Sequence, residues 1–222
     1  MSSKQNQADY EAHIHYIAAF IGGFLVLFPI VNAAHLLGSA QTSNLIDIVL
    51  GSLKGEWKTV LLHALGAFIY AFAVFLATFL PKHAKVNIQI LSMIFDALCA
   101  VVMWRFPSQE NLPAVVYLYP TFFVMPFQWC AFKGAYGFTS STIFSSNNFR
   151  QFISALTEIF FNGDNSYALK AKFFGTTLLA FHLGIGISYI LWKFFGKNGF
   201  LFAIVPALTV LFIIFRKESV LK

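Results

Sequence analysis

The residues best suited to chemistry in this chain are a few polar side chains inside long apolar runs. Asp96 is the only acid well inside such a run, and a charge at the centre of a bilayer costs at least ~3 kcal/mol on insertion scales. Asp96 is therefore expected to face the interior of a helix bundle or to be protonated. It would couple an ion or a proton, or hold a substrate cation; the alternative is an interior polar pair with Asn87, Gln89 or a histidine.

Two histidines and one glutamine lie in similar apolar surroundings. His63 and His182 lie near corresponding places in the two halves of an internal repeat, where imidazole could carry a proton near neutral pH. Each could equally be a hydrogen-bonded interior residue. Gln128 follows Pro126, and a proline inside a helix frees backbone carbonyls that can bind a ligand. The alternative for Gln128 is a hydrogen bond that joins two packed helices.

Two polar blocks recur in the chain, and residues 41–45 align with residues 145–149. Each block precedes an apolar stretch and then a longer run with an Ala-Phe-x-x-small pattern. Asn44 and Asn148 are each followed three residues later by an acid or an amide, which predicts helix N-caps. Two helix N-termini that face each other would form a site for a carboxylate or another polar group. The candidate substrate-binding residues are Gln41, Thr42, Ser43, Asn44, Gln128, Ser146, Asn147 and Asn148; simple capping is the alternative for the asparagines.

The chain shows no pattern typical of an enzyme or of a metal site. It contains no H-E-x-x-H, no G-x-S-x-G and no phosphate-binding glycine loop. Its two cysteines, Cys99 and Cys130, lie in apolar runs and form no C-x-x-C pair. We therefore expect no catalysis, no metal and no cofactor. The net charge of +6 comes from basic residues between apolar runs, which favours contact with lipid headgroups over nucleic acid.

The composition requires a membrane to position these residues. Hydrophobic residues make up 58% of the chain and charged residues 11%, whereas soluble domains carry about 25% charged residues. A spanning helix needs about 20 apolar residues. Ala180, Gly184 and Ser188, four residues apart, predict a close-packing face, and Ala67 and Ala71 predict one in the other half. Six spanning helices are expected, at residues 14–34, 59–80, 86–104, 113–132 (broken by Pro120 and Pro126), 173–195 and 198–215.

These runs predict an all-α integral membrane protein, with a single membrane domain over residues 1–222. The segments that would be cytoplasmic with an inward N-terminus carry more Lys and Arg than the outer ones, which places both termini in the cytoplasm. Three spans per repeat would invert one half relative to the other. The expected parts are a polar N-terminus (1–13), two inverted three-helix repeats (14–104 and 113–215), each with a partial or broken helix at its motif, and a cytoplasmic tail (216–222).

The repeated blocks resemble a known family. Residues 22–24 and 40–45 resemble the GG-x-D and AQTGNL patterns of the YoaK-like bacterial membrane proteins, a family of unknown function. Residues 125–132 and 146–149 are similar to its MGLQNAAF and TGNL patterns. The resemblance implies a multi-pass protein of the bacterial cell membrane with a suspected transport role. Some positions depart from the family: its acid falls near Val26, its motif glycines are Ser43 and Asn147, and its Gln-Asn pair is Gln128-Trp129.

The expected function is a small-molecule permease with a central site between the two blocks, working by rocking of one repeat against the other. Its expected partners are the lipid bilayer and an unidentified small solute, and a homo-oligomer is compatible with this function. Two alternatives stay open. One is a substrate-capture subunit that works with an ATP-driven partner, and the other is a membrane scaffold or sensor that transports nothing.

Overall fold

The computed structural model of the chain describes residues 3–32, 37, 39–107 and 112–220. The expected end of the first span at residue 34, and the ends of the expected terminal segments at residues 1–2 and 221–222, lie outside the described residues. The longer helices are α1 (Ser3–Asn32), α2 (Gln41–Lys54), α3 (Trp57–His83), α4 (Ile88–Arg105), α5 (Tyr119–Ala131), α6 (Ser146–Phe160), α7 (Ala168–Phe195) and α8 (Ile204–Val220). Short 3-10 helices are η2 (Ala114–Leu118), η3 (Asn165–Tyr167) and η4 (Gly196–Ala203), and two short strands are β1 (Gly134–Ala135) and β2 (Phe138–Thr139).

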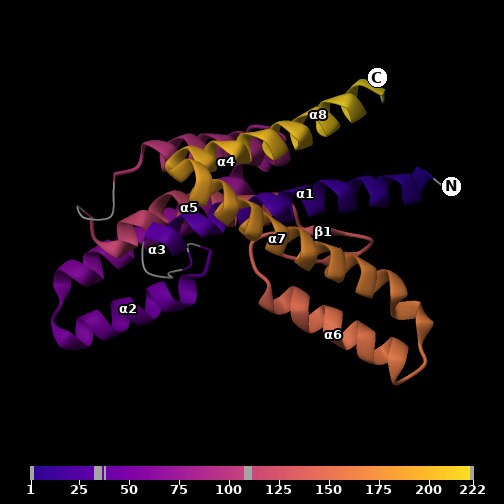
Figure 1. The fold of residues 1–222 in the computed structure, drawn as a ribbon, viewed down its shortest axis with the longest axis horizontal. Coiled ribbons are helices and arrows are strands. Elements are labelled where there is room, and N and C mark those ends of the chain that lie inside the picture. Colours follow the sequence, from indigo (N-terminus) through magenta and orange to yellow (C-terminus); the bar gives the residue numbers. More distant parts are fainter. Residues whose placement is uncertain (1–2, 33–36, 38, 108–111, 221–222) are drawn as a thin grey trace.

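By length and composition, five helical stretches of the described chain could cross a membrane. They are Gln5–Asn32, Trp57–His83, Ile88–Arg105, Ala114–Ala131 and Asn165–Arg216. The fifth stretch contains both α7 and α8, which were expected as separate spans. Between them lies η4, and α8 then runs back toward the end of the molecule where α1 begins (Figure 1).

The helix boundaries differ from the expected segments at three places. Residues 3–13 of the expected cytoplasmic N-terminus are helical and continuous with the first span, because α1 already begins at Ser3, and Gln7 donates a hydrogen bond to Glu11 one turn later, at 2.6 Å. Asn87 lies outside its span as the N-cap of α4, where its Oδ1 accepts from the N–H groups of Gln89 and Ile90. Neither proline breaks the fourth span, because Pro120 lies in the first turn of α5 and Pro126 inside that helix.

A small hairpin also interrupts the helical chain, although strands were not expected. Gly134 pairs with Thr139 and Ala135 with Phe138, in antiparallel register. Tyr136 and Gly137 between them have φ values of 55° and 78°, and positive φ at both central positions is what a two-residue hairpin turn requires.

The helices pack crosswise between the two halves of the chain. Within each half, α2 packs against α3, and α6 packs against α7. The long helix of each pair then packs on the other half, α3 against α5 and α7 against α1. The α2–α3 and α6–α7 pairs extend to opposite ends of the molecule (Figure 1). The helices α4 and α8 contact each other and cover the centre.

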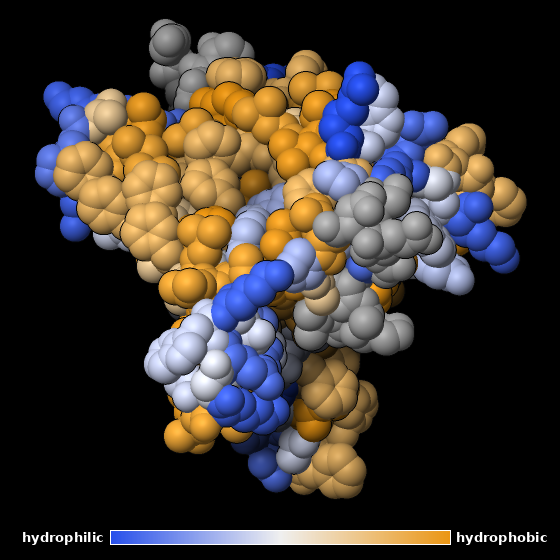
Figure 2. Space-filling view, turned by 90° about the vertical axis from the view of Figure 1, so that its left-hand side faces the viewer, coloured by the Kyte–Doolittle hydropathy of each residue, from blue (hydrophilic) through white to orange (hydrophobic). Residues whose placement is uncertain are grey.

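The buried fractions show that α1 is a central helix and α3 a peripheral one. In the most apolar window of the first candidate span 72% of the residues are buried, against 17% in the second, Trp57–His83. Figure 2 shows apolar side chains over much of the face at the left of Figure 1, with polar side chains gathered in separate patches. An apolar surface of this extent suits a lipid environment. The large exposed side chains of α3 are Trp57, Leu61, Leu65, Phe68, Phe72, Phe75 and Phe79.

Candidate functional site

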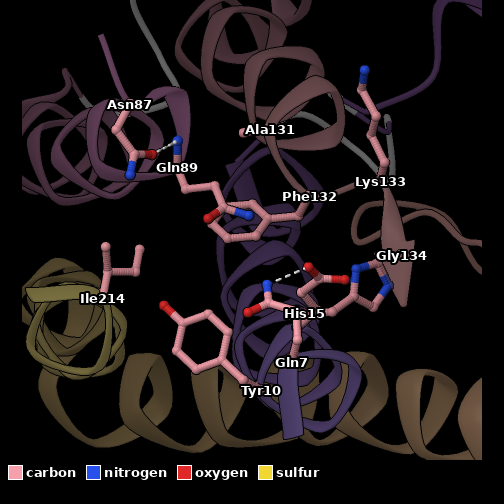
Figure 3. A pocket seen from close by; sticks show the side chains of 11 residues that line it. Gln7, Tyr10, His15, Asn87, Gln89, Ala131, Phe132, Lys133, Gly134 and Ile214 are labelled. Carbon is pink, nitrogen blue, oxygen red and sulfur yellow. Dashed lines mark hydrogen bonds between the residues drawn. The ribbon is translucent and has the colours of Figure 1, made fainter. Parts of the chain in front are cut away.

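A cavity of about 380 Å³ lies among α1, α4, α5 and α8. It is at the end of the molecule that carries both chain termini (Figure 1). Side chains that lie far apart in the sequence meet around it (Figure 3). The lining residues are Gln7, Tyr10, Glu11, His15, Asn87, Gln89, Ala131, Phe132, Lys133, Gly134 and Ile214.

The side chains in the cavity differ in direction. Gln89 and the Tyr10 hydroxyl both extend toward its centre, beside the ring of Phe132, whereas the Lys133 side chain points away from them (Figure 3). Glu11 accepts a hydrogen bond from Gln7 at 2.6 Å, from Nε2 to Oε1. The cavity lining therefore combines one carboxylate with amides and aromatic rings.

This lining was missed at the sequence level, although a signal was present. Gln7, Glu11 and His15 are spaced four apart and lie on one helix face. The segment had been separated from the first span because of its polarity. A polar stripe that continues into an apolar helix indicates a face turned toward water or a ligand rather than toward lipid.

A second polar stripe follows α4 inward from the cavity. Gln89, Ser92 and Asp96 have the three- and four-residue spacing of one helix face. Ser92 and Asp96 are fully buried, which confirms that Asp96 faces the interior. Among the described residues, the Ser92 hydroxyl and both Asp96 carboxyl oxygens have no hydrogen-bond partner. The alternative of a polar pair between Asp96 and Asn87, Gln89 or a histidine is therefore wrong.

Gln128 joins α5 to α1 at the centre of the molecule. Its side chain is fully buried, and its Nε2 donates to the Ala18 carbonyl oxygen at 2.7 Å. Its Oε1 has no partner in the described part of the chain. Half of this amide therefore holds two helices together, and the other half can accept a hydrogen bond.

The second polar block is linked to the cavity through buried hydrogen bonds. Asn148 donates through Nδ2 to the Ser141 carbonyl at 2.7 Å and accepts at Oδ1 from the Ser140 hydroxyl at 3.0 Å. Ser140 Oγ also lies 3.1 Å from Nε2 of His15. This chain of contacts connects α6, the segment after the hairpin, and a residue of the cavity wall.

The first polar block is bound to its own neighbouring helix. Asn44 donates through Nδ2 to the His63 carbonyl at 3.0 Å and to Gln41 Oε1 at 2.9 Å. Its Oδ1 lies 2.8 Å from Nδ1 of His63, which is 3.8 Å from Oδ2 of Asp47. The structure therefore brings His63 together with the first motif, where it fastens α2 to α3.

The prediction that Asn44 and Asn148 cap their helices is wrong. The helix α2 begins at Gln41 after Ala40, and α6 begins at Ser146 after Ser145. Neither preceding residue makes a side-chain capping bond. Both asparagines lie inside the helices because their amides have partners in an adjacent helix or loop.

The remaining predicted site residues are exposed. Thr42, Ser43, Ser146 and Asn147 lie on the surfaces of α2 and α6. His182 is exposed on α7, with Nδ1 2.8 Å from the Leu178 carbonyl oxygen of its own helix. The structure does not bring His182 to the second motif as it brings His63 to the first. Among the described residues, no group of three His, Cys, Asp or Glu side chains could hold a metal ion.

Tyr136 of the hairpin turn holds the start of α1 in place. Its hydroxyl donates to Asp9 Oδ1 at 2.6 Å. Burial, together with the hydrogen bond to Asp9 and the charge of that residue, raises the pKa of Tyr136 to about 12. The phenol therefore stays protonated and keeps donating at neutral pH.

Comparison with known proteins gives one match. A family model described as "Protein of unknown function (DUF1275)" matches residues 14–214. No curated protein and no solved structure matches the chain. The matched range includes His15, Gln89 and Asp96, while Gln7, Tyr10 and Glu11 of the cavity wall precede it.

Proposed function

Because the chain belongs to the DUF1275 family, whose description leaves the function open, we propose a function from the structure: a small-molecule permease of the cell membrane. It carries out no catalysis. The finer resemblance to YoaK-like bacterial proteins, which have a suspected transport role, agrees with this proposal.

The observation that carries the proposal is the buried acid below the polar cavity. Asp96 is fully buried without a hydrogen-bond partner among the described residues. It lies on the same face of α4 as Gln89, which lines the cavity. Burying a polar group without a partner costs free energy, and ionisable residues inside membrane spans mark substrate, ion or proton pathways. Asp96 serves as the coupling group for a proton or a cation.

The arrangement of the helices supports an inverted repeat in the membrane. We assign α1–α4 to one half and α5–α8 to the other, with α2 and α6 as the partial helices. The crosswise packing of α3 on α5 and of α7 on α1 supports this assignment. The α2–α3 and α6–α7 helix pairs, which extend to opposite ends of the molecule, also support it (Figure 1). With both termini cytoplasmic, the cavity opens toward the cytoplasm.

Transport would occur by rocking of one half against the other. The buried amide contacts keep each partial helix on its own half, since Asn44 binds the backbone of α3 and Asn148 binds the segment before α6. Movement would therefore take place at the crossings between halves. Protonation of Asp96 would alternate with solute binding above it.

The test uses the purified full chain and the Asp96→Asn variant, which removes the charge and keeps the shape. Solutes are first identified by thermal stabilisation across a metabolite library, where a ligand at a hundred times its Kd adds about 2.7 kcal/mol. Uptake of each hit is then measured in proteoliposomes with and without a pH gradient. We expect uptake by the wild type and at least tenfold less by Asp96→Asn. Glu158→Gln on α6, outside the cavity lining, is the matched control.

Other outcomes separate the alternatives. Binding without uptake would contradict a self-sufficient permease and favour a capture subunit that needs an ATP-driven partner. No stabilising solute in the whole library would favour a scaffold or sensor. Uptake that Asp96→Asn leaves unchanged would remove Asp96 from the mechanism.

A further inference from the structure

We infer that the cavity binds a small organic cation of the ammonium type, with Glu11 as its counter-ion. This inference rests on the proposed permease function and names the class of solute. It uses Tyr10 and Glu11, which precede the range matched by the family model.

The first support is the sign of the charges inside the candidate spans. The acids of these spans are Asp9, Glu11 and Asp96, all on α1 and α4. Glu11 lines the cavity and Asp96 lies deeper on the face of α4 that begins at Gln89. Most basic residues of these stretches lie toward their ends, and two lie where α7 meets η4 within the fifth stretch: Lys58, Lys82, Arg105, Lys170, Lys172 and Arg216 are the former, Lys193 and Lys197 the latter.

The basic residue at the cavity does not neutralise the acid. Lys133 is exposed, and its side chain points away from the centre of the cavity (Figure 3). No ion pair joins it to Glu11 within the described chain. Glu11 instead accepts a hydrogen bond from the neutral Gln7 amide. In the part of the chain that the structure describes, no Lys133 ion pair therefore competes with a bound cation for the Glu11 carboxylate.

The second support is the aromatic wall. Tyr10 comes from α1 and Phe132 directly follows α5, and both line the cavity, with the Gln89 amide beside the Phe132 ring (Figure 3). Aromatic faces attract ammonium groups, most strongly where water is excluded. Amide oxygens such as that of Gln89 accept hydrogen bonds from an amine or a hydroxyl. A carboxylate, two rings and amides thus suit an ammonium head with a short polar tail.

The third support is size. A cavity of about 380 Å³ lies at the small end of ligand sites, which run from roughly 300 to 1,000 Å³. It has room for a compact amine. A cation bound there would lie at the start of the stripe that leads through Ser92 to Asp96.

The test compares three probes of one shape and different charge. Choline is the cation, 3,3-dimethylbutan-1-ol its neutral isostere, and 3,3-dimethylbutanoate an anion of similar bulk. Binding to the detergent-purified full chain is measured by isothermal titration calorimetry. We expect choline to bind at least tenfold more tightly than either other probe.

The variants test the two groups separately. Glu11→Gln should weaken choline binding at least tenfold and leave the neutral probe unchanged, with Glu158→Gln, outside the cavity lining, as the matched control. Tyr10→Leu should weaken choline binding, whereas Tyr10→Phe should retain it because the ring remains. Melting temperatures of all variants show that each is folded.

Failure of this inference differs from failure of the permease. Tighter binding of the anion or of the neutral probe, or no binding of choline to folded wild type, would overturn the cation site. Uptake of any solute in an Asp96-dependent manner would then still support a permease. Choline binding that Glu11→Gln leaves unchanged would place the cation elsewhere and also overturn the inference.

Discussion

At the scale of single residues, buried polar side chains fall into two groups. Asn44 and Asn148 have both ends of their amides bound by protein groups. Asp96 is equally buried and has no such bond among the described residues. The first kind stabilises the fold, and the second lowers stability unless a ligand, an ion or a proton compensates.

This contrast predicts the effect of removing a satisfied amide. Asn148→Ala should lower the free energy of unfolding by about 1–3 kcal/mol, because Ser140 and the Ser141 backbone lose a buried partner. Thermal unfolding in detergent measures the change. Asn147→Ala, at the exposed neighbouring position, should stay within about 0.5 kcal/mol of the wild type. Equal melting temperatures for both variants would show that the buried contacts carry no stability.

For Asp96, we predict the opposite change in stability. Asp96→Leu should raise the melting temperature and abolish uptake, because no hydrogen bond is lost and a buried polar group is removed. Gln128→Leu is the comparison, since it loses the bond to the Ala18 carbonyl and should lower the melting temperature. A strongly destabilised Asp96→Leu would indicate that Asp96 has a structural partner.

At the scale of elements, the closest approach is the crossing of α1 and α7. A Cβ at Gly23 would overlap the Phe181 carbonyl, and one at Gly184 would overlap the Phe20 carbonyl. Gly184 and Ser188 are buried and Ala180 packs against the core, so the predicted close-packing face on this helix is confirmed. The matching prediction for Ala67 and Ala71 on α3 is not, because Ala71 is exposed. Moving an apolar side chain from lipid into a helix interface gains little free energy. Membrane helices therefore depend on close backbone contacts of this kind for their stability.

The crossing predicts sensitivity to a single methyl group. Gly23→Ala and Gly184→Ala should each cost about 1–3 kcal/mol through overpacking. Gly186→Ala on the same helix meets nothing within 4 Å and should be neutral. Melting temperatures of the three purified variants provide the comparison. Equal melting temperatures for Gly184→Ala and Gly186→Ala would show that α1 and α7 can move apart without loss of stability.

At the scale of the whole molecule, the proposed orientation in the membrane can be tested at the turns that join α2 to α3 and α6 to α7. The α2–α3 turn lies at one end, and the α6–α7 turn lies at the other, beside both termini (Figure 1). In a Cys130→Ala background, Cys99 is buried and should not react. Lys54→Cys should then react with a membrane-impermeant maleimide added outside intact cells, and Asn165→Cys only after the cells are opened. Labelling of both positions from outside would contradict the inverted arrangement.

Much of the secondary structure could be predicted from local sequence. The apolar runs are continuous and long enough to span a bilayer, so most of the expected helices were found. The interior place of Asp96 followed from the cost of exposing an acid to lipid. The helix boundaries were less predictable. The helix α1 begins at Ser3 because its backbone hydrogen bonds continue through polar residues. The helix α5 accommodates both Pro120 and Pro126.

By itself, the sequence therefore determined an all-α protein with helices long and apolar enough to cross a membrane, because composition and the length of apolar runs are local properties. Only the tertiary structure decided where side chains meet. The cavity combines α1, α4, α5 and α8, and its Glu11 and Gln89 are separated by most of the first half of the chain. Asn148 likewise reaches His15 through Ser140. Such contacts depend on helix crossings set by small residues such as Gly23, and no local pattern contains that information.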